Sequence, residues 1–217
     1  AAAGGRGDTA TLAQGRVLGL QPNLVFALLA IASFLCCIPM ALPSAHLIAF
    51  CGDLGLTPGK GAAMLSLLLV CAFFSRQFWG WVSDRIGGLM TLLICSGAQA
   101  IAVTGFLFTQ DEAGLFAVSV AFGLGFSGLI PAYLVTARHL FPAREAPWRM
   151  PSMLLTGTVG MATGGWLGGV IYDQFGSYAP GFATGLLANL VNFVILASLV
   201  IAWRRSLGAG RTVEATA

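Results

Sequence analysis

Six long apolar runs constrain the fold of this chain more than any other feature. They cover residues 24–50, 61–82, 89–109, 113–137, 151–171 and 181–203. A helix that crosses a bilayer needs about 20 apolar residues, and in lipid each backbone amide must be hydrogen-bonded internally. Charged residues make up 9% of the chain, whereas soluble domains carry about 25%. The sequence therefore predicts an all-α, polytopic membrane protein with six transmembrane helices.

The distribution of basic residues predicts the orientation of these helices. If the six runs alternate in direction, nine of the 11 Lys and Arg residues fall on one side. Lys60 falls on the other side, and Arg76 lies within the second run. Because short cytosolic loops are enriched in Lys and Arg, we expect both termini in the cytosol and a multi-pass protein of the bacterial inner (plasma) membrane. We expect the lipid bilayer as its surroundings and no nucleic acid as a partner.

The chain divides by composition into three segments. Residues 1–22 are polar and glycine-rich and are predicted to be a cytosolic linker. Residues 23–205 form the predicted six-helix bundle, and residues 206–217 a short cytosolic tail. Pro39 and Pro43 lie in the first run and predict a bend near its outer end, because each proline removes a backbone donor.

Arg76 is the charge that lies deepest in a predicted spanning segment. A charged side chain at membrane depth costs about 2.5–3.5 kcal/mol on insertion scales, so its retention points to a partner, a water-filled cavity or an anionic ligand. The planar guanidinium stays charged and binds a carboxylate through two hydrogen bonds. Arg76 lies about six residues, roughly 9 Å, from the cytosolic end of its run. Two interpretations follow: contact with a ligand or pathway, or a long side chain that reaches the interface.

The sequence gives little support for a catalytic site or a metal site. The five cysteines form no C-x-x-C pair, and four of them lie in apolar runs, so we interpret them as small core residues. We predict no metal, no cofactor and no enzymatic activity. One alternative is an intramembrane serine protease, because Gly125, Phe126, Ser127 and Gly128 resemble its G-x-S-G motif. The sixth run, however, contains no histidine that could serve as the base.

The turn between the second and third runs carries a resemblance to a known family. Gly80, Asp84, Arg85 and Gly87 match G-x-x-x-D-R-x-G, which resembles the turn between the second and third helices of each half in the major facilitator superfamily. A second stretch, from Gly168 to Tyr178, is similar to the G-G-x-x-Y-D-x-x-G-S-Y pattern before the last helix of many bacterial members. The resemblance covers residues 22–205 and implies one half of a twelve-helix bundle, here the C-terminal half.

The resemblance also implies roles for individual residues. Members similar to the oxalate–formate antiporter and the monocarboxylate carriers place an arginine four residues before the turn glycine, where it binds the substrate carboxylate. Arg76 holds that position relative to Gly80. Gly80, Asp84, Arg85 and Gly87 would then form part of a cytosolic gate.

His46 and Asn189 are two further candidates for substrate binding. Histidine titrates near neutral pH, which suits a site coupled to protons, although a helix-end position explains His46 equally. Asn189, with Asn192 and Gln99, could instead form hydrogen bonds between helices. Gly160, Gly164 and Gly168 recur every four residues and predict close helix packing, either within one bundle or at a surface that slides.

We therefore interpret the chain as one half of a secondary transporter for a small, monocarboxylate-like organic anion. Transport would proceed by alternating access around a central site, with a proton as a candidate coupling ion. The missing N-terminal six-helix half would come from the same polypeptide or from a partner chain. The alternative is a half-sized membrane subunit, or a carrier of unknown substrate that works as a dimer.

Overall fold

A computed structural model describes residues 16–214, with side chains up to Ser206, and it contains helices and no strand in this range. Six segments are long and apolar enough to cross a membrane, which confirms the predicted number. The helices are α2 (Pro22–Asp53), α3 (Pro58–Ile86), α4 (Gly88–Phe108), α5 (Glu112–Phe126), α6 (Leu129–Leu140), α7 (Ala146–Phe175) and α8 (Ala179–Glu214).

Local sequence signals explain where several of these helices begin and end. Pro22 and Pro58 occupy the first turns of α2 and α3, where a missing amide hydrogen costs nothing. The Asp111 side chain accepts a hydrogen bond from the Gly114 amide at 2.8 Å and caps α5. Gly87, with φ at +86°, separates α3 from α4, a backbone conformation that favours glycine.

The fourth predicted run is interrupted in the structure. We expected one helix over residues 113–137, but α5 ends at Phe126 and α6 begins at Leu129. Ser127 and Gly128 keep right-handed helical backbone angles, so the two helices still form one membrane span from Glu112 to Leu140. The cause is tertiary contact with α3, as described below.

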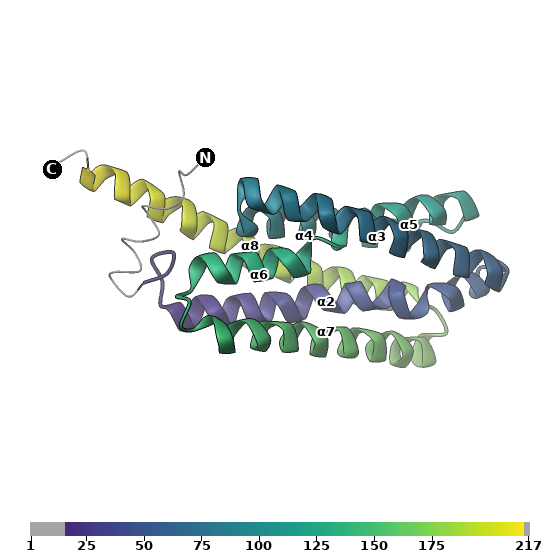
Figure 1. Cartoon of the computed structure of the whole chain (residues 1–217). Coiled ribbons are helices and arrows are strands. Elements are labelled where there is room, and N and C mark those ends of the chain that lie inside the picture. The colour runs from purple at the N-terminus through teal and green to yellow at the C-terminus, as the bar shows by residue number, and fades with distance from the viewer. Residues whose placement is uncertain (1–15, 215–217) are drawn as a thin grey trace.

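The helices form one elongated bundle (Figure 1). In this view α2 lies between α6 and α7, with α8 behind it, and α3 runs along the upper edge in front of α4 and α5. The packing agrees with this arrangement: α2 packs mainly against α7 and α8, α3 against α5, and α4 against α8. We call the end of the bundle where α2 begins the terminal end, and the opposite end the distal end.

The first helix passes through both of its prolines without interruption. Pro39 and Pro43 lie inside α2, and both are buried. Most of the predicted linker, residues 1–15, lies outside the described residues. At the other end, α8 continues as a helix to Glu214, beyond the predicted boundary at residue 205. The segment boundaries stay predictions.

Aromatic side chains fill the distal half of the core. Phe106 of α4 stacks on Phe182 of α8 at 5.3 Å between ring centroids. Phe122 of α5 lies 5.9 Å from Phe106, and Phe50 of α2 lies 5.3 Å from Phe182. The cluster connects four spans.

Candidate functional site

Arg76 lies on the exposed side of α3, about one third of the helix length from its end at Ile86. Since α3 continues to Ile86, ten residues beyond Arg76, the Cα of Arg76 lies about 15 Å from that helix end. Among the described residues, no ion pair or side-chain hydrogen bond involves Arg76. The guanidinium is therefore available to a group outside this bundle.

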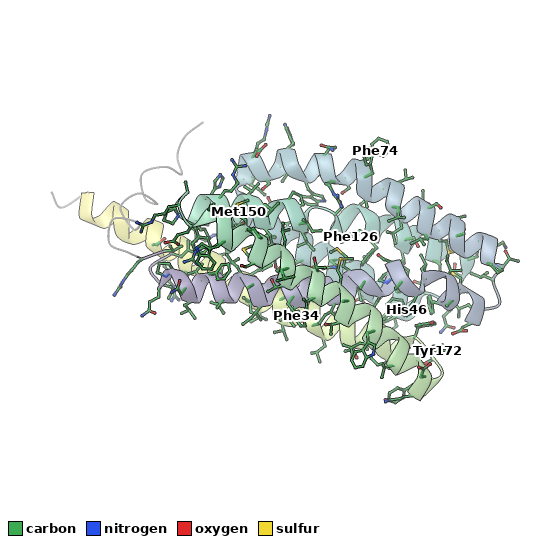
Figure 2. All side chains as sticks on the ribbon, turned by 60° about the horizontal axis from the view of Figure 1, so that its bottom comes forward. Phe34, His46, Phe74, Phe126, Met150 and Tyr172 are labelled. Atoms are coloured by element: carbon green, nitrogen blue, oxygen red, sulfur yellow. The ribbon has the colours of Figure 1, made fainter. Side chains whose placement is uncertain are left out.

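The exposed surface of α3 has two faces of different chemistry. Phe74, Phe78 and Trp81 follow each other at helical spacing and are 54–67% exposed, as expected of a surface in contact with lipid. Figure 2 shows Phe74 at the edge of the bundle. Arg76, Gly80 and Asp84 are four residues apart and share a different face. The predicted binding arginine and two gate residues thus lie along one line.

The predicted gate residues form few side-chain contacts within the described part of the chain. The Arg85 guanidinium lies over the Trp81 ring, 4.0 Å from the centroid. Within the described part of the chain, Asp84 is exposed and has no ion pair. An added Cβ at Gly80 would meet nothing within 4 Å. Asp84 and Gly80 thus present an open surface near the terminal end.

The residues next to Arg76 fix α3 to the break between α5 and α6. Ser75 Oγ and Trp79 Nε1 both donate hydrogen bonds to the Leu124 carbonyl oxygen, at 2.5 and 2.7 Å. A Cβ at Gly128 would come within 2.5 Å of the Trp79 side chain. The Trp79 side chain therefore occupies the space that a Cβ at position 128 would need. The sequence held a signal for this break in the glycines at positions 123, 125 and 128.

Asn189 lies inside the bundle rather than on the face that carries Arg76. Its side chain has no exposed surface. Its Nδ2 donates to the Ser96 carbonyl oxygen, and its Oδ1 accepts from Ser96 Oγ, each at 3.0 Å. Asn192 Nδ2 donates to the same Oδ1 at 3.2 Å, and Tyr133 donates its hydroxyl to Asn192 Oδ1 at 3.2 Å. These contacts join α4, α6 and α8.

His46 lies towards the distal end, away from Arg76. Its Nε2 is 2.8 Å from the Gly165 carbonyl oxygen, and because a carbonyl only accepts, this nitrogen carries a proton. The ring packs against Tyr178 at 5.3 Å between centroids. Burial, together with the negative charges of Asp53 and Asp173, raises the pKa of Tyr178, so its hydroxyl stays protonated at neutral pH. Figure 2 shows His46 and Tyr172 near each other at this end.

The predicted glycine stripe faces α2 within the same bundle. A Cβ at Gly160 would lie 2.3 Å from the Phe34 carbonyl oxygen. A Cβ at Gly164 would lie 2.4 Å from the Ile38 carbonyl oxygen, and one at Gly168 would lie 2.7 Å from the His46 ring. These three glycines let α7 approach the α2 backbone.

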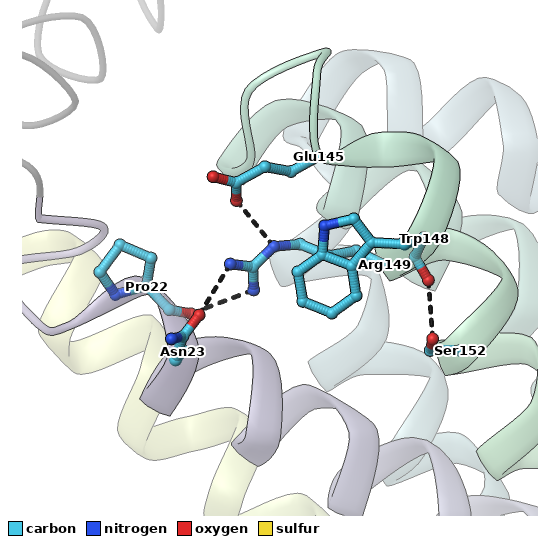
Figure 3. A network of polar contacts seen from close by, with 6 residues as sticks. All are labelled: Pro22, Asn23, Glu145, Trp148, Arg149 and Ser152. Carbon is cyan, nitrogen blue, oxygen red and sulfur yellow. Dashed lines mark hydrogen bonds and ion pairs between the residues drawn. The ribbon is translucent and has the colours of Figure 1, made fainter.

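Arg149 forms a buried network that the sequence analysis did not identify. It is one of the nine Lys and Arg residues that the sequence places on one side of the membrane, and in the structure it is the fourth residue of α7 and only 3% exposed. Its Nε donates to Glu145 at 2.8 Å and its Nη2 to Asn23 Oδ1 at 2.9 Å (Figure 3). The guanidinium lies 4.3–5.0 Å from the ring centroids of three aromatic residues, Phe26, Phe141 and Trp148. The network fastens α7 to the start of α2.

Known proteins resemble this chain in sequence and in fold. The family model described as Major Facilitator Superfamily matches residues 29–215. Monocarboxylate transporter 13 from Bos taurus is 26% identical over 163 residues, which cover 70% of this chain and 38% of that relative. The chain thus spans well under half of the relative's length. Two solved structures share the fold: the transporter FucP in the outward conformation and the peptide transporter POT in complex with alafosfalin. Their TM-scores are 0.71 and 0.73, their identities 17% and 15%, and each match covers 88% of this chain and 44% of the other.

Proposed function

The chain belongs to the Major Facilitator Superfamily, and from that premise we propose that it is one six-helix half of a secondary transporter for a small organic anion. In this proposal the carboxylate of the substrate binds Arg76. The other half, on the same polypeptide or on another chain, covers the face of α3 that carries Arg76, Gly80 and Asp84. The family assignment also makes the chain a transporter rather than a protease.

The single observation that carries the proposal is the position of Arg76. The guanidinium is exposed, and among the described residues it has no acceptor. Its Cα lies about 9 Å from the end of the apolar run and about 15 Å from the end of α3, which carries Asp84 and Arg85 in its last turn. An anionic ligand between the halves would offset the cost of this buried charge.

The chemistry of arginine favours a carboxylate as that ligand. A guanidinium offers parallel N–H groups to the two oxygens of a carboxylate, and such charged hydrogen bonds are about twice as strong as neutral ones. The resemblance to Monocarboxylate transporter 13 supports the same class of substrate. Transport would follow alternating access, in which one half rocks against the other around a site near the midplane.

Orientation and gating follow from the same arrangement. Arg16, Arg85, Arg138, Arg144, Arg204 and Arg205 lie at or near the terminal end, whereas Lys60 lies at the distal end. By the positive-inside rule the terminal end faces the cytosol of a bacterial inner membrane. Asp84 would then meet the positive end of a helix dipole in the other half and hold the cytosolic gate closed. A proton is the coupling ion that we propose.

Substitution of Arg76 tests the proposal. We expect Arg76→Ala to lower uptake of small monocarboxylates by the complete transporter at least about 100-fold, a loss of about 2.7 kcal/mol in binding. Arg76→Lys should retain part of the activity, because it keeps the charge but not the planar pair of donors. Arg138→Ala, at an exposed arginine of α6, is the matched control and should transport normally.

Uptake is measured in proteoliposomes that contain equal amounts of folded protein, judged by size-exclusion chromatography. If Arg76→Ala takes up carboxylates within twofold of the wild type, Arg76 does not bind the substrate. If a chain of this length alone transports at the wild-type rate as a dimer, a second copy rather than a different half covers the face.

A further inference from the structure

A small pocket opens between α2, α6 and α7, the three helices that lie side by side in Figure 1. We propose that this pocket receives the hydrocarbon chain of a monocarboxylate whose charged end binds Arg76, an inference that rests on the proposed function. Its volume is about 70 Å³. The lining residues that decide its chemistry are Ser33, Cys36, Tyr133, Leu154, Thr158 and Met161.

The polar groups of this lining are turned to partners other than the cavity. Ser33 Oγ donates to the Met153 carbonyl oxygen at 3.3 Å, and Thr158 Oγ1 donates to the Leu154 carbonyl oxygen at 2.9 Å. The Tyr133 hydroxyl donates to Asn192, as described above. These donors are therefore occupied, and the surface left for a ligand is mostly apolar. Such a surface favours an apolar group, because burial of a polar group without a hydrogen bond is costly.

The pocket lies at the same depth as Arg76. Arg76 is ten residues from the terminal end of α3, and Ile130, which lines the pocket, is ten residues from the terminal end of α6. Ser33 and Gly157 are each eleven residues from the starts of α2 and α7. At 1.5 Å per residue all four positions lie about 15–17 Å from that end. α3 packs against α6, and α6 lines the pocket, so we infer that a ligand bound to Arg76 extends across α6 into the pocket.

The size of the pocket limits the length of the chain it accepts. One water requires about 10–15 Å³, so 70 Å³ holds roughly five to seven water-sized groups. Among the described residues, Arg76 is the only Lys or Arg away from the ends of the spanning segments. A second carboxylate would enter the apolar pocket without a partner. The pocket therefore selects short-chain monocarboxylates and rejects dicarboxylates of similar length.

Leu154 and Leu155 provide a matched pair for the test. Leu154 lines the pocket and is 44% exposed, whereas Leu155 is 64% exposed and does not line it. We expect Leu154→Ala in the complete transporter to shift the preferred substrate towards longer chains by one or two carbons. Each additional buried methylene should raise affinity about fourfold. Leu155→Ala should leave the preference unchanged, and Thr158→Phe, which fills the pocket, should shift it towards acetate.

The assay is competition of unlabelled straight-chain acids, from acetate to hexanoate, and of succinate against uptake of labelled butyrate. A chain-length profile that Leu154→Ala and Thr158→Phe leave unchanged would overturn the pocket while the transport proposal stands. Succinate that competes as well as butyrate would also overturn it. If the wild type takes up no carboxylate under a proton gradient or by exchange, the proposed function fails and the pocket inference fails with it.

Discussion

Substitution by alanine should have opposite effects on stability at the neighbouring positions Gly164 and Gly165. Both glycines lie in the middle of α7, so alanine gains the same helix propensity at each site, up to about 1 kcal/mol. A Cβ at Gly164 would lie 2.4 Å from the Ile38 carbonyl oxygen and 2.8 Å from its Cα, whereas one at Gly165 would meet nothing within 4 Å. Because the atoms that collide at Gly164 belong to backbone, only a separation of α2 from α7 can relieve the contact.

The difference in stability between Gly164→Ala and Gly165→Ala measures the free-energy cost of moving α2 away from α7. Overpacking in a well-packed interior costs about 1–3 kcal/mol, and the propensity gain cancels between the two sites. With about 2–4 °C per kcal/mol for a domain of this size, Gly164→Ala should unfold about 2–12 °C below Gly165→Ala. Gly165→Ala should match or slightly exceed the wild type.

Thermal unfolding of the purified, detergent-solubilised transporter provides the measurement, read by size-exclusion chromatography after heating. Variants are compared at equal protein and detergent concentration. Equal midpoints for the two variants would show that α2 and α7 do not approach each other through this glycine, and the described packing would be wrong.

Substitutions at Arg149, Trp79 and Ser75 test the polar contacts between helices, with Arg144→Gln as a control. Arg149→Gln should destabilise the bundle by about 3 kcal/mol. This value lies at the lower end of the range for a broken buried ion pair, because the carboxylate partner of Arg149 is 26% exposed. Arg144→Gln, at an exposed position, should change stability by less than about 0.5 kcal/mol. Trp79→Phe should cost about 1 kcal/mol because the Leu124 carbonyl oxygen keeps its bond from Ser75. Combination with Ser75→Ala should cost more than the two single losses together, since the Leu124 carbonyl oxygen then has no side-chain donor. Strictly additive costs in the same unfolding assay would contradict a shared acceptor.

The six spans could be predicted from the sequence because a bilayer imposes a minimum length of apolar residues on each helix. Hydropathy did not predict the break at Ser127 and Gly128, because the apolar run continues through both residues. The Trp79 side chain, which packs beside Gly128, donates a hydrogen bond to the Leu124 carbonyl oxygen 45 residues later in the chain. Hydropathy describes each run alone and carries no information on such a contact.

In the candidate site too, local motifs identified some residues, whereas contacts with distant parts of the chain could not be predicted. Arg76 lies on the exposed side of α3, and its role in substrate binding stays a prediction. The burial of Arg149 was not predicted, because a basic residue beside a loop satisfies the positive-inside pattern whether it is solvated or buried. Its burial depends on Phe26 and Phe141, which lie in other helices or loops. Asn189 fits the alternative that the sequence left open, a hydrogen bond between helices.

The close packing of α2 against α7 has a consequence for the biosynthesis of the protein. Ser33 bonds to the Met153 carbonyl oxygen, 120 residues further along the chain. At about 5–20 residues per second, the ribosome needs about 6–24 s to synthesise that interval. During this time the face of α2 that later contacts the glycines is in the membrane without its partner. The translocon, a chaperone or lipid must shield this face until α7 emerges, so the bundle can close only late in translation.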